Sequence, residues 1–142
     1  MNLTILIVED EEDDVFFLKR AFAKVAPQIA VRVARDGEEA IADLERVDPI
    51  PSLVLLDLKL PRKSGLEVLH WMRTNPETRE VPVIIRSSSN VLSDLERAFE
   101  LGCSFYILKQ LGSGELHNLT KCIADFLKVQ GRNTLRLPLF GI

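Results

Sequence analysis

Four polar residues in this chain directly follow short apolar segments, and their types suit phosphoryl chemistry. Glu9 and Asp10 follow one such segment, Asp57 follows a second and Lys109 follows a third. A short apolar segment bounded by charged residues is typical of a buried parallel strand. Ligands bind at the carboxyl ends of the strands in an open α/β sheet. Three acids opposite one amine at that edge therefore predict a site for a divalent cation and a phosphoryl group.

Strands and helices are predicted to alternate five times along the chain, because short apolar segments alternate with segments of helical periodicity. The expected strands are 3–8, 30–34, 53–56, 81–85 and 105–108, and the expected helices are 13–25, 38–47, 66–74, 93–101 and 113–129. The strands are apolar on both faces, which indicates an α/β fold with a doubly wound five-stranded parallel sheet and five helices. In the strand order 2-1-3-4-5, the first, third, fourth and fifth strands bring their charged ends to one edge.

Length and composition indicate one globular domain and exclude several function classes. The chain has 142 residues, 46% of them hydrophobic, and a net charge of -3. This charge argues against nucleic acid as the primary partner. No apolar stretch reaches the ~20 residues of a membrane span, so no membrane partner is expected. No leader pattern precedes the first strand, and Cys103 and Cys122 lack metal-ligand spacing. We therefore expect a cytoplasmic protein with two buried thiols.

The predicted edge has the groups that phosphoryl transfer needs. Crowded carboxylates raise one another's pKa unless a cation neutralises them, and hard oxygen ligands suit Mg²⁺. Asp57 is a candidate nucleophile toward phosphorus, because aspartyl phosphate is an established intermediate of this side chain. Lys109 would neutralise the phosphoryl oxygens, and Ser87 would donate a hydroxyl group from the end of the fourth strand. Which of Ser87, Ser88 and Ser89 faces the site depends on strand alternation.

Four segments in order closely resemble the receiver domains of two-component response regulators. They are 7–10, 55–61 together with Gly65, 82–87 and 105–109. The resemblance covers about 3–129 and implies a CheY-like, flavodoxin-like fold. It implies that Asp57 is the phosphoacceptor and that Mg²⁺ is held by Glu9, Asp10, Asp57 and the backbone carbonyl of Lys59. The alternative ion at such a site is Mn²⁺.

The same resemblance implies how the protein works as a switch. Lys109 takes the position of the family's lysine, Ser87 that of its switch hydroxyl and Tyr106 that of its switch aromatic. A histidine kinase is the expected phosphoryl donor, and the protein is a signalling switch rather than a turnover enzyme. Residues 1–130 would form the receiver and 131–142 a short tail, with no output domain. The acidic start and the Leu-Pro-containing tail resemble stand-alone regulators of bacterial phytochrome kinases.

Two positions depart from the family pattern, and two others concern the lifetime of the phosphoryl group. Gln110 replaces the usual proline after the lysine, so we expect a trans peptide bond and a reshaped loop. Arg86 interrupts an apolar strand and is expected to pair with an acid, to reach solvent or to contribute to an interface. Lys59 and Ser89 occupy positions where the resemblance implies an influence on that lifetime.

Other readings make distinct predictions. A phosphorylation-independent interaction module would have lost an acid or the lysine, and a phosphate sink in a phosphorelay is a further alternative. A phosphatase with an Asp nucleophile commonly has a second Asp two residues later, where this chain has Lys59. Tyr106 is either a half-buried packing residue or a moving switch. His70 and His117 are expected on the surface, and Trp71, Phe16 and Phe17 in core or rim packing.

The region of the fourth helix, fifth strand and fifth helix is the candidate output and homodimer surface. Its apolar residues are expected to supply faces beyond what one core requires. They are Leu95, Phe99, Leu116, Leu119 and Ile123. The apolar tail 135–142 is a candidate for docking on its own domain or on a neighbouring one.

Overall fold

The computed structural model describes residues 3–46, 49–109 and 113–128. Within these residues, five strands alternate with five helices, as predicted. The strands are β1 (Thr4–Val8), β2 (Ala30–Ala34), β3 (Leu53–Leu56), β4 (Val83–Ser87) and β5 (Phe105–Leu108). The helices are α1 (Glu12–Val25), α2 (Gly37–Glu45), α3 (Gly65–Thr74), α4 (Leu92–Glu100) and α5 (Ser113–Lys128).

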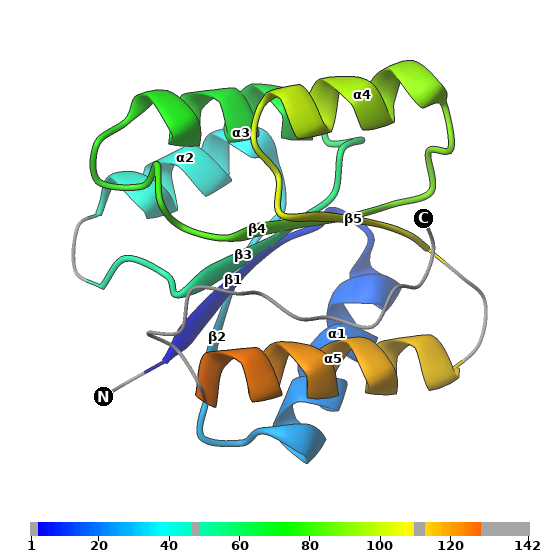
Figure 1. Cartoon of the computed structure of the whole chain (residues 1–142). Coiled ribbons are helices and arrows are strands. Elements are labelled where there is room, and N and C mark those ends of the chain that lie inside the picture. Colours follow the sequence, from blue (N-terminus) through cyan, green and yellow to red (C-terminus); the bar gives the residue numbers. More distant parts are fainter. Residues whose placement is uncertain (1–2, 47–48, 110–112, 129–142) are drawn as a thin grey trace.

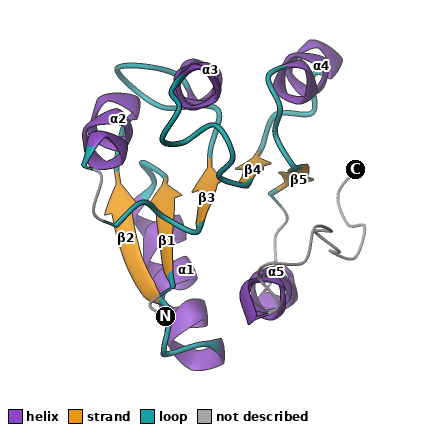
Figure 2. Cartoon of the chain, turned by 60° about the vertical axis from the view of Figure 1, so that its left-hand side comes forward, coloured by secondary structure: helices purple, strands orange, loops and turns teal. Residues whose placement is uncertain are grey.

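The strands form one parallel sheet between two layers of helices. Their order is β2-β1-β3-β4-β5, and every pairing is parallel (Figure 2). Helices α2, α3 and α4 cover one face, and α1 and α5 cover the other (Figure 1). This arrangement confirms the doubly wound fold and the predicted strand order. None of the helices within the described ranges is long and apolar enough to cross a membrane.

Each face of the sheet has its own hydrophobic core, because successive side chains of a strand point to opposite faces. Leu6 and Tyr106 belong to the core under α2, α3 and α4. Ile5 and Phe22 belong to the core under α1 and α5. All four side chains have no exposed surface. Full burial of a large apolar side chain stabilises a protein by about 1.5–3 kcal/mol, so both layers of helices are held mainly by these cores.

Strand β4 differs from its prediction by two residues at each end. The predicted strand 81–85 ended before the charged Arg86, whereas the observed strand begins at Val83 and continues through Arg86 and Ser87. Arg86 pairs in register with Ile107, and Ser87 with Leu108. The strand continues because the Arg86 guanidinium is paired with an acid from α5. This pairing confirms one of the outcomes expected for Arg86.

The other differences concern element ends and surface residues. Most of the remaining bounds are unchanged or shift by one residue, as is usual where element ends are defined by backbone hydrogen bonds. The predicted end of the second helix at Val47 and that of the last helix at Val129 lie outside the described residues. The prediction of core or rim packing for Phe16 and Phe17 is wrong, because 58% and 49% of their surface is exposed. Their rings contact each other edge to face on α1, so they form an exposed aromatic pair.

Two apolar residues that were expected on the candidate homodimer surface belong to the core instead. Leu119 and Ile123 have no exposed surface and pack under α1 and α5. They face the sheet because α5 packs against α1 along this side of the molecule. Leu95 and Leu116 are half-buried, and Phe99 is exposed on α4. The expectation of an extra apolar surface is therefore wrong for Leu119 and Ile123, whereas Phe99 on α4 provides such a surface.

The loop after β3 is held against the start of α2. The Arg62 guanidinium lies 2.8 Å from Asp36, whose other oxygen accepts the Glu39 N–H and caps α2. The Gly37 N–H donates to the Pro61 carbonyl oxygen over 3.4 Å. These contacts fix the loop that follows Asp57 and therefore the shape of the nearby edge of the sheet.

Gly65 allows this loop to turn back against β3, and its substitution provides a test of the fold. A Cβ atom added at Gly65 would lie 2.2 Å from the Asp57 carbonyl oxygen and 2.7 Å from the Leu58 Cα atom. Because backbone atoms cannot rotate away, we expect Gly65→Ala to lower the free energy of unfolding by roughly 2 kcal/mol in urea titrations. The control is Gly114→Ala on α5, where a Cβ atom meets nothing within 4 Å. Equal stability of the two variants would contradict this account.

Candidate functional site

The site forms where β1 and β3 end side by side. The Glu9 N–H donates to the Ala34 carbonyl oxygen, and the Asp57 N–H donates to the Val8 carbonyl oxygen, each over 3.0 Å. The sheet ladder therefore continues into both acidic residues and fixes their backbones. As a result, side chains about 50 positions apart in the sequence meet at the carboxyl edge of the sheet.

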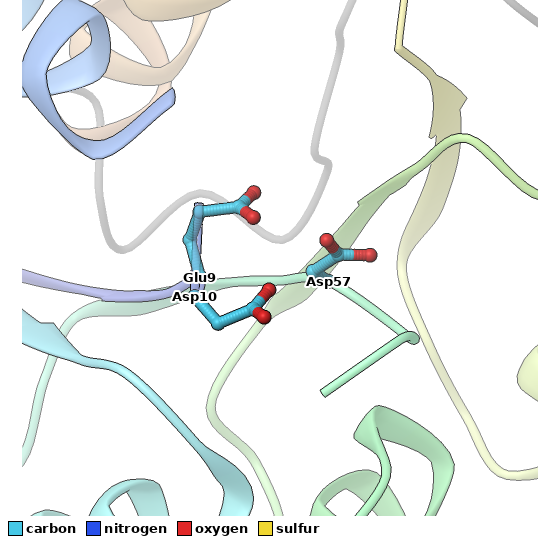
Figure 3. Close-up of side chains that lie close together, drawn as sticks. All are labelled: Glu9, Asp10 and Asp57. Carbon is cyan, nitrogen blue, oxygen red and sulfur yellow. The ribbon is translucent and has the colours of Figure 1, made fainter. Parts of the chain in front are cut away.

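Three carboxylates converge at this edge. Glu9 and Asp10 lie at the end of β1 and reach toward Asp57 at the end of β3 (Figure 3). One carboxylate oxygen from each lies within 4.8 Å of the others. Glu9 and Asp57 are buried, whereas Asp10 is exposed, so the group is open to solvent on one side. Hard oxygen donors with room for water fit a Mg²⁺ or Mn²⁺ ion.

Lys109 provides the positive charge of the site. Its Nζ atom lies 3.0 Å from a carboxylate oxygen of each of Asp57, Glu9 and Asp14, and 3.3 Å from Glu11. Burial lowers the pKa of Lys109, whereas the hydrogen bond to Asp57 and the negative charge of Asp57 raise it. Together with Asp14 and Glu9, they raise the pKa of Lys109 above its ordinary value. The ammonium therefore stays charged and holds the acids together.

Glu9 is the acid whose ionisation the site changes most. Its pKa is raised to about 7, first by burial and then by the negative charge of Asp57. The Lys109 ammonium and the hydrogen bond from the Glu11 N–H offset part of this rise. A bound divalent cation would favour the ionised form of Glu9, because it would neutralise the crowded charge.

A chain of hydrogen bonds leads from the site toward α4. The Ser89 N–H donates to the Ser87 hydroxyl oxygen over 3.3 Å, and the Tyr106 hydroxyl donates to the Ser89 carbonyl oxygen over 2.8 Å. The Ser89 hydroxyl lies 2.5 Å from an Asp94 oxygen in the first turn of α4. Tyr106 is fully buried, so the half-buried alternative is wrong, and burial raises the pKa of its hydroxyl.

Strand alternation separates the three adjacent serines. Ser87 and Ser89 are buried, and Ser88 is exposed. The backbone of Ser87 is beside Lys109, whose N–H donates to the Ser87 carbonyl oxygen over 2.9 Å.

The Lys59 N–H donates to Asp57 Oδ1 over 3.2 Å, and the Lys59 side chain is exposed. The predicted site residues therefore lie around one edge of the sheet.

Sequence analysis missed two acids that contact Lys109. Glu11 and Asp14 lie just after the predicted acidic pair, at the start of α1. The unbroken acidic run from Glu9 to Asp14 was the available signal, but strand ends alone did not show that the start of α1 turns back over the lysine. His70 and His117 are exposed, as predicted. Gln110 lies outside the described residues.

A surface hollow lies away from this site. It has a volume of about 570 Å³ and is lined by residues of α2, α3 and α4 together with Lys63 and Leu101, including Trp71 and Arg97. Neither Lys109 nor any of the acids that contact it lines this hollow, and Asp10 does not line it either. The hollow is therefore separate from the charged edge.

The chain matches the family model of the response regulator receiver domain over residues 5–121. It therefore belongs to the response regulator receiver family. This result agrees with the parallel sheet and the acidic edge described above.

The chain is also similar to individual response regulators. Response regulator Rcp1 of Synechocystis is 31% identical over 127 residues, which cover 86% of each protein. The crystal structure of the phosphorylated cyanobacterial phytochrome response regulator RcpA has a TM-score of 0.83 and 31% identity, covering 98% of this chain and 100% of that one. The Mn²⁺-bound form of Rcp1 has a TM-score of 0.79 and 30% identity, covering 96% and 99%. The chain is thus similar to phytochrome response regulators over nearly their whole length.

The raised pKa of Glu9 predicts how stability depends on pH without divalent cations. The pKa is about 7 in the folded chain and 4.5 ordinarily, so the folded state binds more protons between these values. The contribution of Glu9 to stability is therefore fully present below pH 4.5 and is lost as the pH rises through 7. Glu9→Gln should remove this slope, which is at most about 1.4 kcal/mol per pH unit.

Urea unfolding from pH 5 to pH 8 in a chelator would measure the slope. Glu45→Gln, at an exposed position at the end of α2, is the control and should keep the wild-type slope. Equal slopes for wild type and Glu9→Gln would show that Glu9 does not titrate in this range.

Proposed function

We propose that this chain is a phosphoryl-accepting switch of a two-component system, with Asp57 as the phosphoacceptor. The observation that supports this most strongly is the position of buried Asp57, 3.0 Å from the Lys109 ammonium and grouped with Glu9 and Asp10. A carboxylate held in this way has a cation on one side and an acidic group fit for Mg²⁺ on the other.

In the proposed reaction, an Asp57 carboxylate oxygen attacks the phosphorus atom of a kinase phosphohistidine. The P–N bond breaks as a P–O bond forms, and the histidine leaves with the nitrogen electron pair. Glu9, Asp10, Asp57 and the Lys59 backbone carbonyl would hold Mg²⁺, which supplies charge neutralisation at the phosphoryl oxygens. Mn²⁺ is the alternative ion, and the Mn²⁺-bound form of Rcp1 supports this assignment.

Lys109 and Ser87 would act on the phosphoryl group directly. The Lys109 ammonium already lies 3.0 Å from Asp57, so small movements bring it to phosphoryl oxygens bound to that carboxylate. Ser87 would donate its hydroxyl to another phosphoryl oxygen. The chain accepts a group and assists its own phosphorylation and dephosphorylation, without turning over an external substrate.

Switching would pass through Ser89 to α4. When Ser87 turns toward the phosphoryl group, its oxygen leaves the Ser89 N–H. Because Ser89 also contacts Tyr106 and Asp94, both would be free to move. The surface of α4, β5 and α5 would then change its affinity for partners. Lys59 and Ser89 would influence the phosphoryl lifetime through their positions around Asp57.

The proposed donor is a sensor histidine kinase in the cytoplasm, with a bacteriophytochrome as the leading candidate. RcpA, a phosphorylated phytochrome response regulator, supports this pairing. Residues 1–130 would form the receiver and 131–142 a tail. The alternatives are an interaction module that works without phosphorylation and a phosphate sink. The retained Asp57 and Lys109 favour the switch over the interaction module.

Phosphorylation can be tested with acetyl phosphate and Mg²⁺, followed by intact-protein mass. We expect a gain of one phosphoryl group that requires Mg²⁺ and is absent in Asp57→Asn, because the amide is a poor nucleophile. Asp13→Asn, an exposed position in the first turn of α1, should be labelled like wild type.

Labelling that persists in Asp57→Asn would identify another nucleophile and contradict the proposal. If acetyl phosphate fails, a phosphorylated histidine kinase replaces it as the donor. Failure with both donors would favour the phosphorylation-independent module.

We further propose that α4 contributes a homodimer surface. Leu92 and Phe99 lie seven residues apart on one face of this helix, and 68% and 46% of their surface is exposed. Only Ala98 of α4 is buried, so most of the helix's apolar surface lies outside the core. A second copy of the chain, meeting the same face, would cover it.

Light scattering with and without Mg²⁺ and beryllofluoride, a phosphoryl mimic, would test this surface. We expect a mass above the monomer value in at least one state and about tenfold weaker association of Phe99→Ala in that state. Phe16→Ala removes an aromatic of α1 that is more exposed than Phe99, and this variant should associate like wild type. A monomeric mass in both states at micromolar concentration would rule out the dimer.

A further inference from the structure

Arg86 is a buried charge that the proposed reaction does not use. It lies in β4 directly before Ser87, and only 4% of its surface is exposed. Its Nε and Nη2 atoms donate to the two oxygens of Glu115 on α5 over 3.1 and 3.0 Å. This two-point pairing compensates a guanidinium in a hydrophobic layer.

The third guanidinium nitrogen of Arg86 has a different environment. Nη1 is buried and donates no hydrogen bond to any described residue. Asp14 Oδ1 on α1 lies 3.7 Å away, close enough for charge attraction but too far for a hydrogen bond. A buried donor without a hydrogen bond is unfavourable. Arg86 Nη1 can therefore still donate a hydrogen bond, and Asp14 is a nearby acceptor.

Asp14 lies between two cations. Its Oδ2 atom is 3.0 Å from Lys109 Nζ, and Lys109 Nζ is in turn 3.0 Å from Asp57. A series of alternating charges therefore runs from Asp57 through Lys109, Asp14 and Arg86 to Glu115. It crosses from the end of β3 to α5, on the face of the sheet covered by α1 and α5.

We propose that Asp14 exchanges partners, from Lys109 to Arg86, when Asp57 carries a phosphoryl group. This inference rests on the proposed function and extends it. Phosphoryl oxygens at Asp57 attract the Lys109 ammonium, which weakens its contact with Asp14. The Asp14 carboxylate then closes the 3.7 Å gap and accepts the free hydrogen bond of Arg86 Nη1. No charge is left unpaired at either stage.

Arg86 is thus a positioning residue for Lys109. It attracts Asp14 and so determines how readily Lys109 leaves that acid for the phosphoryl group. The exchange also moves α1, which carries Asp14, relative to Arg86 and its partner Glu115 on α5. A purely structural role, in which Arg86 only joins β4 to α5, would require Glu115 and not the Asp14 contact.

Nitrogen NMR of arginine side chains would test the exchange directly. On addition of Mg²⁺ and beryllofluoride, we expect the Arg86 Nη1 signal to shift as it gains a hydrogen bond. The shift should occur in wild type and in Asp13→Ala but be absent in Asp14→Ala, which removes the acceptor and leaves the buried Arg86–Glu115 pair intact. Amide signals of Asp57 report independently whether the mimic binds.

The outcomes separate the two proposals. No change at the Asp57 amide would overturn the exchange together with the site it depends on. A change at Asp57 with an unchanged Arg86 signal would overturn the exchange alone. An Arg86 shift of the same size in Asp14→Ala would do so as well, because Asp14 would not be its cause.

A double-mutant cycle provides a second, energetic readout. The affinity for the mimic is measured for Asp14→Asn in the wild-type background and in Arg86→Gln/Glu115→Gln, which neutralises the buried pair together. If Asp14 and Arg86 are coupled, the change in affinity caused by Asp14→Asn should differ between the two backgrounds by about threefold or more. Equal effects in both backgrounds would show that Asp14 and Arg86 act independently and would overturn the exchange.

Discussion

The compensation of several carboxylates by the single ammonium of Lys109 is the interaction on which the rest of the site depends. Glu9 and Asp57 are buried beside each other, and burial of like charges is unfavourable unless a cation lies between them. Lys109 contacts both, and it can do so because β5 ends at the same edge as β1 and β3. The contacts of Lys109 with the two buried acids therefore depend on the strand order of the sheet.

Strand β4 connects this charged edge to both layers of helices. Its last two residues point to opposite faces, as strand geometry requires. Ser87 is linked through Ser89 to Tyr106 and to α4, on one face. Arg86 is linked to Glu115 on α5 and faces Asp14 on α1, on the other. A change at Asp57 thus has a route of polar contacts to each layer, and these contacts lie within otherwise apolar cores.

Much of the fold and the central site residues could be predicted from the sequence. Apolar segments that end on Glu9, Asp57 and Lys109 show both the strands and the edge where these residues meet, because parallel strands align their carboxyl ends. The burial of Leu119 and Ile123 could not be predicted, since helical spacing shows an apolar face but not how much of it the sheet covers. The exposure of Phe16 and Phe17 was missed for the same reason.

The sequence by itself determined the class of fold, the family and the residue types at the edge of the sheet, because these depend on local periodicity and on short motifs. Only the tertiary structure decided the partners of each charge. The sequence left open whether Arg86 pairs with an acid, reaches solvent or contributes to an interface. Its pairing with Glu115, 29 residues away, depends on how α5 packs on the sheet. The contact of Asp14 with Lys109 also depends on helix packing, because the start of α1 turns back over the edge of the sheet. Charge pairing acts through space, and distance along the chain does not reveal it.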